Sequence, residues 1–456
     1  MDAVTNPLTV AIVGSGPSGF YAAGALLDNE DLDVRVDMFE RLATPWGLVR
    51  FGVAPDHPKI KSVSSVYAKI AAQESFRFFG NVEVGATISH GELTERYDAV
   101  IYAIGTQGGR QLGVPGEDLP GSEAAVDFVG WYNGHPDYAD REFDLSSERA
   151  VVVGAGNVAL DVARILCSPY DRLVKTDIAD HALQALRDSN ITEVLVVARR
   201  GPAQVAFTTP ELKELPEFTA SGVDVRPDEV ADSSDDDSLS KVAKRNLGVM
   251  REYAKGETEL GERHISLRFL RSPVELRGDG KVEQIVLGRN ELRTGEDGWV
   301  SARDTGEREI VDTGLVLRAV GYHGVAVDGL PFDERRGVIP NEKGRVVDSE
   351  REYVVGWIKR GPTGIIGTNK KDAVETVNQL LEDLSEGRLQ RHERDATIDV
   401  EDWLTQRQPK LVTEQGWQLI DAAERKAGEP TGRPRVKMCN LDDMLAVALG
   451  ESHSGS

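Results

Sequence analysis

Near the start of the chain, two short unbroken apolar runs flank a longer stretch rich in alanine and leucine. Leu8–Val13 is an unbroken apolar run rich in β-branched residues, and an Ala/Leu-rich stretch follows it to Leu27. A second apolar run covers Val34–Phe39 and ends at Glu40. A short unbroken apolar run is typical of a strand that is buried on both faces. We therefore predict a strand, a helix and a second, parallel strand.

The same order recurs in the middle of the chain. Ala150–Val153 is apolar, a helical pattern extends to about Leu166, and Glu193–Ala198 is the next β-branched run. Similar patterns predict strands at residues 99–104, 315–320 and 353–356 and helices at 179–187, 239–253 and 371–384. Strands that alternate with helices predict an α/β fold with largely parallel sheets.

Each of the two first strands ends in a glycine-rich turn. The turns are Gly14-Ser15-Gly16-Pro17-Ser18-Gly19 and Gly154-Ala155-Gly156-Asn157-Val158-Ala159. In such a turn the first glycine permits the bend, the second lets the backbone approach a pyrophosphate, and the third small residue lets helix and strand pack closely. The phosphates lie at the N-terminus of the helix, where free N–H groups favour negative charge. Both segments therefore predict a bound dinucleotide.

The second predicted strand of each segment is followed by residues of opposite charge, an acid in the first segment and two arginines in the second. Glu40 can accept hydrogen bonds from an adenosine ribose, whereas Arg199 and Arg200 suit a ribose 2′-phosphate, which a carboxylate would repel. NADP is favoured over NAD in the second unit, unless the arginines are only surface charge. Arg199 lies 45 residues after Gly154, about twice the usual interval, so residues 167–190 are predicted to be an inserted loop and helix.

These two sites suggest FAD and NADPH in one chain. In such proteins a hydride passes from nicotinamide C4 to flavin N5, and the protein supplies binding, orientation and electrostatics.

Composition narrows the possible partners. The 456 residues carry a formal net charge of -23, which argues against nonspecific binding to nucleic acid or to anionic lipid, because both are polyanions. The two cysteines, Cys167 and Cys439, exclude a C-x-x-C centre and a four-cysteine metal site, and no metal is predicted. The sequence has no apolar run of about 18 residues and no basic leader segment. We therefore expect a cytoplasmic protein without a membrane helix.

Three long motifs resemble those of the adrenodoxin reductase family, and more closely those of its bacterial NADPH–ferredoxin reductases. They are TPWGLVRFGVAPDHPK at residues 44–59, GAGNVALDVAR at 154–164 and GWIKRGPTGIIGTNKK at 356–371. The resemblance extends from Leu8 to about Leu449. It implies two Rossmann-like nucleotide-binding domains of the glutathione reductase type. An FAD-binding domain of residues 1–108 and 322–456 would be interrupted by an NADP-binding domain of residues 109–321.

The resemblance also implies which residues contact the cofactors. Besides Gly14, Gly16 and Gly19, those implied for FAD are Ser15, Glu40, Leu48, Trp357, Gly364, Ile365 and Ile366. Those implied for NADPH are Arg110, Gly156, Asn157, Val158, Ala159, Arg199, Arg200 and Glu211, with Gly364 nearby. The physical chemistry agrees in part, because a glycine-rich turn at 361–367 before a helix can stabilise a reduced flavin with its N–H groups. Trp357 offers a face to the flavin, or is an ordinary core tryptophan.

Three titratable residues are candidates for a role in catalysis. The resemblance places His57 near the flavin and Glu214 as its partner near the nicotinamide, and Asp161 is the third candidate. A His–Glu pair can position the nicotinamide or take up a proton. A purely structural hydrogen bond is the alternative.

The activity implied by the resemblance is that of an FAD-dependent ferredoxin–NADP+ reductase. NADPH would reduce FAD, and single electrons would pass to a ferredoxin that serves cytochrome P450 or other iron–sulfur-dependent enzymes. An acidic ferredoxin needs a basic docking face on this acidic chain. We predict such a face on one helix, with a rim near the flavin motifs and the acidic run of residues 228–237 turned away or mobile. The helix residues are Lys241, Lys244, Arg245, Arg251 and Lys255, and the rim residues are Lys59, Lys61, Lys359, Arg360, Lys370 and Lys371.

A monomer would suffice for this activity, because both cofactor sites lie in one chain. Two other functions stay open. One is an electron-input flavoprotein like the small subunit of glutamate synthase, although the chain lacks the cysteine-rich iron–sulfur segment of that type. The other is a noncatalytic protein that binds or senses nucleotides.

Overall fold

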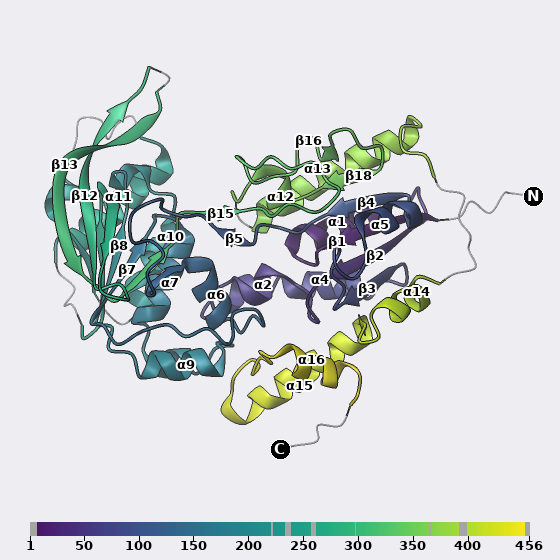
Figure 1. Cartoon of the computed structure of the whole chain (residues 1–456), viewed down its shortest axis with the longest axis horizontal. Coiled ribbons are helices and arrows are strands. Elements are labelled where there is room, and N and C mark those ends of the chain that lie inside the picture. Colours follow the sequence, from purple (N-terminus) through teal and green to yellow (C-terminus); the bar gives the residue numbers. More distant parts are fainter. Residues whose placement is uncertain are drawn as a thin grey trace, which may run out of the picture. The chain divides into compact units, whose positions relative to one another are not determined.

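The computed structural model describes residues 7–219, 222–232, 239–256, 261–296, 298–364, 366–391 and 399–451. The chain divides into two compact units (Figure 1). The first comprises residues 1–53, 57–108 and 322–456, and the second comprises residues 54–56 and 109–321. The second unit therefore interrupts the first. The chain crosses from one unit to the other mainly at the short strands β5 (Gly108–Gly109) and β15 (Tyr322–His323).

An eight-stranded sheet forms the centre of the first unit. Its order is β16-β17-β18-β4-β1-β2-β3-β19, and the five strands from β18 to β3 are parallel. The strands are β1 (Leu8–Val13), β2 (Val34–Glu40), β3 (Phe76–Gly80), β4 (Ala99–Tyr102), β16 (Asn341–Glu342), β17 (Arg345–Val346), β18 (Glu352–Val354) and β19 (Val412–Thr413). All six residues of β1 are buried, because helices cover both faces of a parallel sheet.

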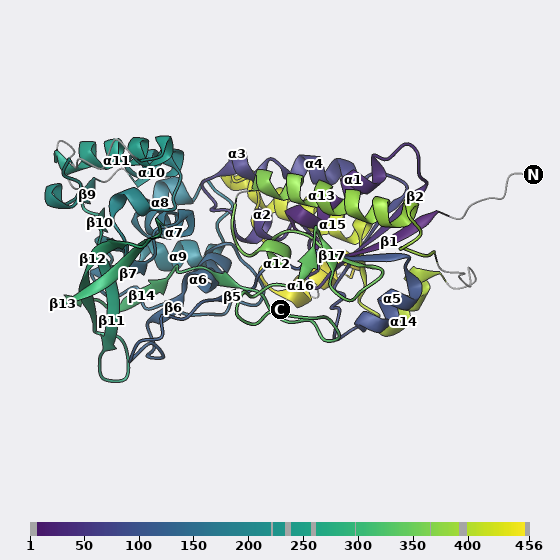
Figure 2. The ribbon, with the colours of Figure 1, turned by 90° about the horizontal axis from the view of Figure 1, so that it is seen from above.

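The helices of the first unit lie on the two faces of this sheet (Figure 2). α1 (Pro17–Leu27), α4 (Ser64–Ala71) and α13 (Ile366–Ser385) share one apolar core with the sheet. α5 (His90–Arg96) and α14 (Val400–Arg407) share a second core on the other face. The remaining helices are α2 (Leu48–Phe51), α3 (Pro58–Lys61), α12 (Trp357–Arg360), α15 (Glu414–Gly428) and α16 (Leu441–Ala448).

The C-terminal segment of the first unit is tied to α2 by a buried ion-pair network. Glu424 of α15 is fully buried and accepts hydrogen bonds from Arg50 Nη1 at 2.9 Å, Arg435 Nη1 at 2.9 Å and the Met438 N–H at 2.8 Å. Nearby, the rings of Trp46 and Trp417 meet edge to face. The loop that precedes α2 is therefore held by residues from the far end of the sequence.

A six-stranded, entirely parallel sheet forms the centre of the second unit. Its order is β6-β14-β7-β8-β10-β9. The strands are β6 (Ser122–Ala124), β7 (Arg149–Val153), β8 (Glu193–Val197), β9 (Val223–Val225), β10 (His264–Arg268) and β14 (Leu315–Arg318). The helices are α6 (Ala125–Tyr132), α7 (Asn157–Cys167), α8 (Tyr170–Leu173), α9 (Asp180–Arg187), α10 (Thr209–Thr219) and α11 (Lys241–Ala254).

A second, antiparallel sheet covers one face of this six-stranded sheet. It consists of β11 (Arg271–Arg277), β12 (Gln284–Thr294) and β13 (Val300–Asp312). Its apolar side chains, among them Leu276, Ile285 and Leu287, share a core with Val151 of β7 and Leu195 of β8. The second unit thus has a sheet where a doubly wound domain would carry helices.

The α/β fold with two nucleotide-binding units is confirmed, but some elements differ from their prediction. α13 begins at Ile366 rather than Lys371, because the helix starts directly after the glycine turn. The β11–β13 sheet was not predicted from the sequence. Its signal was the tight Gly278-Asp279-Gly280 turn between two strand-forming runs, a typical hairpin pattern. Within the described ranges, no helix is both long and apolar enough to cross a bilayer.

We expect Glu424→Gln to destabilise the first unit by about 3–5 kcal/mol, because removal of one partner leaves buried guanidinium charge uncompensated. Arg50 is 3% exposed and Arg435 is 9% exposed. Urea unfolding followed by tryptophan fluorescence measures the effect. Glu429→Gln, at an exposed acid at the end of the same helix, is the matched control and should change little. Equal stability of both variants would contradict the importance of the network.

Candidate functional site

The first glycine turn lies where the parallel strands of the first unit end. Gly14 has φ +103°, and a Cβ there would stand 2.5 Å from the Ala103 carbonyl oxygen at the end of β4. A Cβ on Gly19 would lie 2.2 Å from the Gly14 carbonyl oxygen. In contrast, no heavy atom lies within 4 Å of a Cβ built on Gly16. The turn is therefore packed on its protein side and open at the position that would face a ligand.

Glu40 and Ser15 are joined at this turn. Glu40 ends β2, and its Oε2 accepts hydrogen bonds from Ser15 Oγ at 2.6 Å and from the Ser15 N–H at 3.1 Å. Its Oε1 accepts one from the Leu42 N–H at 3.0 Å. Each carboxylate oxygen has further lone-pair capacity. The predicted ribose acceptor therefore also fixes the turn on which the phosphates would lie.

A loop from the motif at 44–59 crosses this turn. The Trp46 N–H donates to the Ser15 carbonyl at 3.0 Å. Gly47 has φ +48°, and a Cβ on it would stand 2.9 Å from Gly16 Cα. Leu48, the first residue of α2, is 38% exposed. The contact explains why a glycine is needed at position 47.

The last predicted flavin residues follow β18. Gly356 has φ +77°, and a Cβ on it would lie 2.2 Å from Ser18 Oγ of α1. This contact places the segment that begins with Trp357 beside the first turn. Gly364 also has positive φ, at +86°, and Ile366 is the first residue of α13. Ile365 lies outside the described residues.

Several buried polar atoms that follow strands of the first sheet lack a hydrogen-bond partner in the described part of the chain. They are Trp357 Nε1, Thr44 Oγ1, which follows β2, and Thr106 Oγ1, which follows β4. Buried polar atoms are normally hydrogen-bonded, so an unpaired set calls for an explanation such as a bound group. The donors and the open Gly16 position fit a flavin dinucleotide. Trp357 is partly exposed, with its ring centre 5.3 Å from that of Tyr322.

The second glycine turn repeats the geometry of the first. Gly154 has φ +146°, and a Cβ on it would lie 2.3 Å from the Ala319 carbonyl oxygen at the end of β14. Gly156 is open, with nothing within 4 Å of its Cβ position. Asn157 begins α7, and its Oδ1 accepts a hydrogen bond from the Thr208 N–H at 2.8 Å. Val158 and Ala159 follow in the first turn of α7, and Ala159 is buried.

The arginine pair lies at this second turn despite the long interval in sequence. β7 and β8 are parallel neighbours with Val153 opposite Val197, and the Gly154 N–H donates to the Val197 carbonyl at 2.9 Å. Arg199 and Arg200 come directly after this point. After α7, the additional residues before β8 form the two helices α8 and α9, where a loop and one helix had been predicted. Arg199 is exposed, so its guanidinium is accessible to a ligand.

Three carboxyl groups of the second unit pair with one buried arginine. Arg164 of α7 is fully buried and forms ion pairs with Asp56 at 2.6 Å, Asp161 at 2.7 Å and Glu211 at 3.5 Å. Glu214 lies on α10 (Thr209–Thr219), one helical turn beyond Glu211. Asp56 belongs to the second unit through this contact, although the sequence analysis assigned residues 1–108 to the other domain.

The surroundings of Glu211 favour its protonated form. Burial first, then the negative charge of Asp161, raises the pKa of Glu211 to about 7, while the positive charge of Arg164 opposes the shift. Glu211 can therefore hold or release a proton near neutral pH. Asp161, a candidate for catalysis, is held by Arg164.

Other predicted site residues are placed as follows. His57 is buried at the start of α3 in the first unit, and Glu214 lies on α10 of the second unit. A pairing of these two side chains stays a prediction. Arg110 is exposed, and its N–H donates to the Gly321 carbonyl at 3.0 Å.

The predicted basic docking face is smaller than expected. Lys359 is buried and ion-paired with Asp372 at 3.0 Å and Glu375 at 2.7 Å. Arg360 also binds Asp372. Both therefore support α13 and were wrongly assigned to the rim, because their acidic partners lie more than ten residues away in sequence.

On α11, Arg251 and Lys255 pair with acids, Asp232 and Glu252. At Asp232 the acidic run is therefore not turned away from α11, whereas the other alternative, a mobile run, stays a prediction. Residues 233–238 lie outside the described residues. Lys241, Lys244 and Arg245 are exposed on the first half of the helix. They remain as the candidate docking residues of α11.

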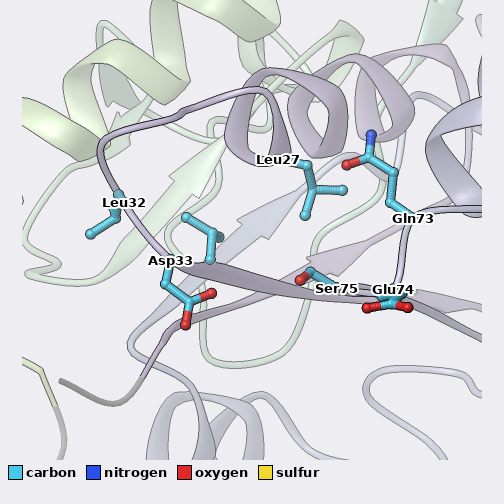
Figure 3. A pocket seen from close by; sticks show the side chains of 7 residues that line it. Leu27, Leu32, Asp33, Gln73, Glu74 and Ser75 are labelled. Atoms are coloured by element: carbon cyan, nitrogen blue, oxygen red, sulfur yellow. The ribbon is translucent and has the colours of Figure 1, made fainter. Parts of the chain in front are cut away.

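A cavity of about 170 Å³ lies elsewhere in the first unit (Figure 3). It is lined by Leu27, Leu32, Asp33, Val34, Gln73, Glu74 and Ser75. These residues surround the start of β2, whereas the first glycine turn lies at the other end of the parallel strands. A cavity of this size with two acids and no basic residue does not suit a dinucleotide.

Comparison with known proteins agrees with this geometry. A family model described as pyridine nucleotide-disulphide oxidoreductase matches residues 8–254, more than half of the chain. The chain belongs to this family. As a member of the family it is an oxidoreductase, and the resemblance to the adrenodoxin reductase type is confirmed by its relatives.

Two curated relatives are similar over nearly their whole length. NADPH-ferredoxin reductase FprA of Mycobacterium tuberculosis is 57% identical over 455 residues, covering 98% of this chain and 100% of that protein. The mitochondrial NADPH:adrenodoxin oxidoreductase of Salvelinus fontinalis is 43% identical over 453 residues, covering 96% and 91%. A solved structure of Mycobacterium tuberculosis FprA in complex with NADPH matches with a TM-score of 0.94 at 57% identity, covering 98% and 100%.

We expect Glu211→Gln to stabilise the protein at pH 8 and to have little effect at pH 4.5. The folded protein keeps the Glu211 proton up to about pH 7, whereas the ordinary pKa is 4.5. Folding therefore takes up a proton between these values, and the stability of the wild type falls as pH rises through them. Removing the ionisable group should raise the melting temperature at pH 8 by roughly 1–3 °C. Calorimetry of both proteins at the two pH values measures this. A gain that is equal at both would contradict the raised pKa.

Proposed function

We propose that this chain is an NADPH–ferredoxin reductase that holds FAD in the first unit and NADPH in the second. The observation that carries the proposal is the charge at the two glycine turns. Both turns have the same backbone geometry, but Glu40 borders one, and Arg199 and Arg200 border the other. A carboxylate suits a ribose hydroxyl pair, and arginines suit a 2′-phosphate. The relatives named for NADPH and ferredoxin or adrenodoxin support the same function.

The cofactors supply the redox chemistry, with two electrons entering from NADPH and single electrons leaving to an iron–sulfur protein. The residues of this chain bind and orient them. In the first unit, the open position at Gly16 would accept the pyrophosphate of FAD, and Glu40 would accept hydrogen bonds from its ribose. The donors Trp357 Nε1 and Thr106 Oγ1 would gain partners.

In the second unit, the proposal gives the residues matching roles. The open position at Gly156 would accept the pyrophosphate of NADPH, and Arg199 and Arg200 would bind its 2′-phosphate. Glu211 would hold a proton close to the nicotinamide end, since its pKa of about 7 lets the carboxyl act as a hydrogen-bond donor at neutral pH.

Purified protein should carry a yellow flavin that NADPH bleaches within seconds under anaerobic conditions. Arg199→Ala and Arg200→Ala should each raise the KM for NADPH by about 10-fold or more, because a hydrogen bond to a charged group contributes about 1.5–3 kcal/mol. The KM for NADH, which has no 2′-phosphate, should change little. Arg187→Ala, at an exposed arginine of α9, controls for loss of positive charge.

The possible failures of this experiment have different meanings. No bleaching by NADPH or NADH would refute the enzyme and leave a nucleotide-binding protein. Bleaching that is equally fast in the arginine variants would refute the NADP site at β8. Cytochrome c reduction that no ferredoxin of the same organism accelerates would refute the acceptor.

We further propose that an acidic ferredoxin docks on Lys241, Lys244 and Arg245 of α11. Lys244→Glu with Arg245→Glu should raise the KM for ferredoxin at low salt by about 10-fold, with less difference at high salt, because exposed charges act on association and are screened. Lys175→Glu with Arg187→Glu gives the same change in net charge at other exposed positions. If both double variants behave alike, only net charge matters and the docking face is wrong.

The finer properties of the protein are also proposals. We propose that it acts as a monomer, because the residues proposed for both cofactors lie in one chain. We also propose a cytoplasmic location. Cys167 and Cys439 are not joined in a disulfide, which suits a reducing compartment.

A further inference from the structure

The arginine loop after β8 is held by the antiparallel sheet of the second unit. Three successive carbonyl groups of the loop accept hydrogen bonds from that sheet and the turn that leads into it. The Arg271 N–H donates to Ala198 at 3.0 Å, Asn290 Nδ2 donates to Arg199 at 2.9 Å, and the Leu270 N–H donates to Arg200 at 3.1 Å. The backbone that carries both arginines is therefore fixed by the sheet that the sequence analysis missed.

The tip of the same sheet reaches the arginine side chains. Beyond Gly288 a bulge interrupts the β12–β13 ladder, and from Asn290 to Thr294 the strand β12 pairs only with β13 (Figure 1). A Cβ on Gly201, the residue after the arginine pair, would lie 3.3 Å from Leu292 Cδ1 of this ribbon. The ribbon therefore lies against the arginine loop.

Trp299 belongs to the turn of this ribbon. Its carbonyl accepts a hydrogen bond from the Gly295 N–H at 2.9 Å, and its side chain is 64% exposed. The guanidinium carbon of Arg200 stands 5.6 Å from the centre of the Trp299 ring. A guanidinium that stacks on an aromatic ring keeps its N–H groups free at the edge of its plane. The edge is the part that binds a phosphate.

We propose that Trp299 determines the preference for NADPH by holding the Arg200 guanidinium in the orientation that binds the 2′-phosphate. The inference rests on the proposed function, because it needs the 2′-phosphate site at the end of β8. Trp299 is a positioning residue here and acts through Arg200. It explains why so large an apolar side chain is exposed at the tip of a ribbon, next to the two arginines that distinguish this turn from the first one.

The test uses the intact flavoprotein and two nucleotides that differ in the 2′-phosphate. Binding of adenosine 2′,5′-bisphosphate and of adenosine 5′-monophosphate is measured by calorimetry, so that no catalytic turnover is needed. Trp299→Ala should weaken the binding of the bisphosphate by about 5-fold, the size expected for a cation–π contact at an exposed site. It should leave the monophosphate unchanged. Trp299→Phe should restore most of the affinity, because phenylalanine keeps an aromatic face.

Two further variants separate this role from general effects. Ile310→Ala removes an exposed apolar side chain from the same strand β13, at a position that pairs with Val286 of β12, far from the turn that carries Trp299. This variant should change neither affinity. In the Arg200→Ala background, Trp299→Ala should cost nothing further, since residues that act through one another are not additive. The flavin spectrum and the melting temperature of each variant report whether it is folded.

The outcomes distinguish the inference from the function on which it rests. If Arg200→Ala loses the bisphosphate but Trp299→Ala does not, the inference is wrong and the NADP site stands. Equal losses for both nucleotides in Trp299→Ala would also overturn it, because the ring would then contact the adenosine rather than position Arg200. If Arg200→Ala has no effect on either nucleotide, the NADP site and the inference both fail.

Discussion

The structure depends on one close backbone contact, which occurs in both units. Gly14 packs against the carbonyl of Ala103, and Gly154 packs against the carbonyl of Ala319, with no room for a Cβ at either place. The hydrogen bonds around the two contacts also correspond. The Gly14 N–H donates to Phe39 and the Gly154 N–H to Val197, each on the neighbouring strand. The ends of three parallel strands are thereby locked together, and the helix that follows begins at a fixed point.

Since this contact is the same in both units, the chemical difference between them comes from what surrounds it. In the first unit Glu40 bonds to the turn itself, and a loop held by the C-terminal segment crosses above Gly16. In the second unit the residues after β8 are basic, and a separate sheet fixes their carbonyl groups. The same strand ends therefore carry an acid in one unit and arginines in the other, as the proposed function requires.

The sequence predicted the parts of the fold that depend on local pattern. Unbroken apolar runs identified β1 and β7, and the glycine spacing located both turns, because these features are encoded by neighbouring residues. The pairing of Gly154 with Arg199 was correctly placed in spite of the inserted α8 and α9. The arginines stood out by charge alone, because the corresponding strand of the first unit ends in an acid, Glu40.

The sequence was a poor guide where a side chain's role depends on a distant partner. Lys359 resembles a surface lysine until Asp372 and Glu375 of α13 are seen beside it. Trp299 had no signal in the sequence, since its proximity to Arg200 arises from a hairpin about a hundred residues further along the chain. Ion pairs and ring contacts of this kind join residues that are far apart in the sequence, so the spacing of hydrophobic residues does not predict them.

The Asp56–Arg164 ion pair affects how the second unit can be expressed as a separate fragment. Asp56 comes from the N-terminal part of the chain but is counted with the interrupting unit, where it binds a fully buried arginine. A fragment of residues 109–321 would thus be made without one of the carboxylates that neutralise Arg164. Loss of one partner of a buried charge is destabilising, so a fragment cut only at β5 and β15 should be less stable than the same unit in the whole chain. A short linked copy of residues 54–56 would have to accompany the fragment.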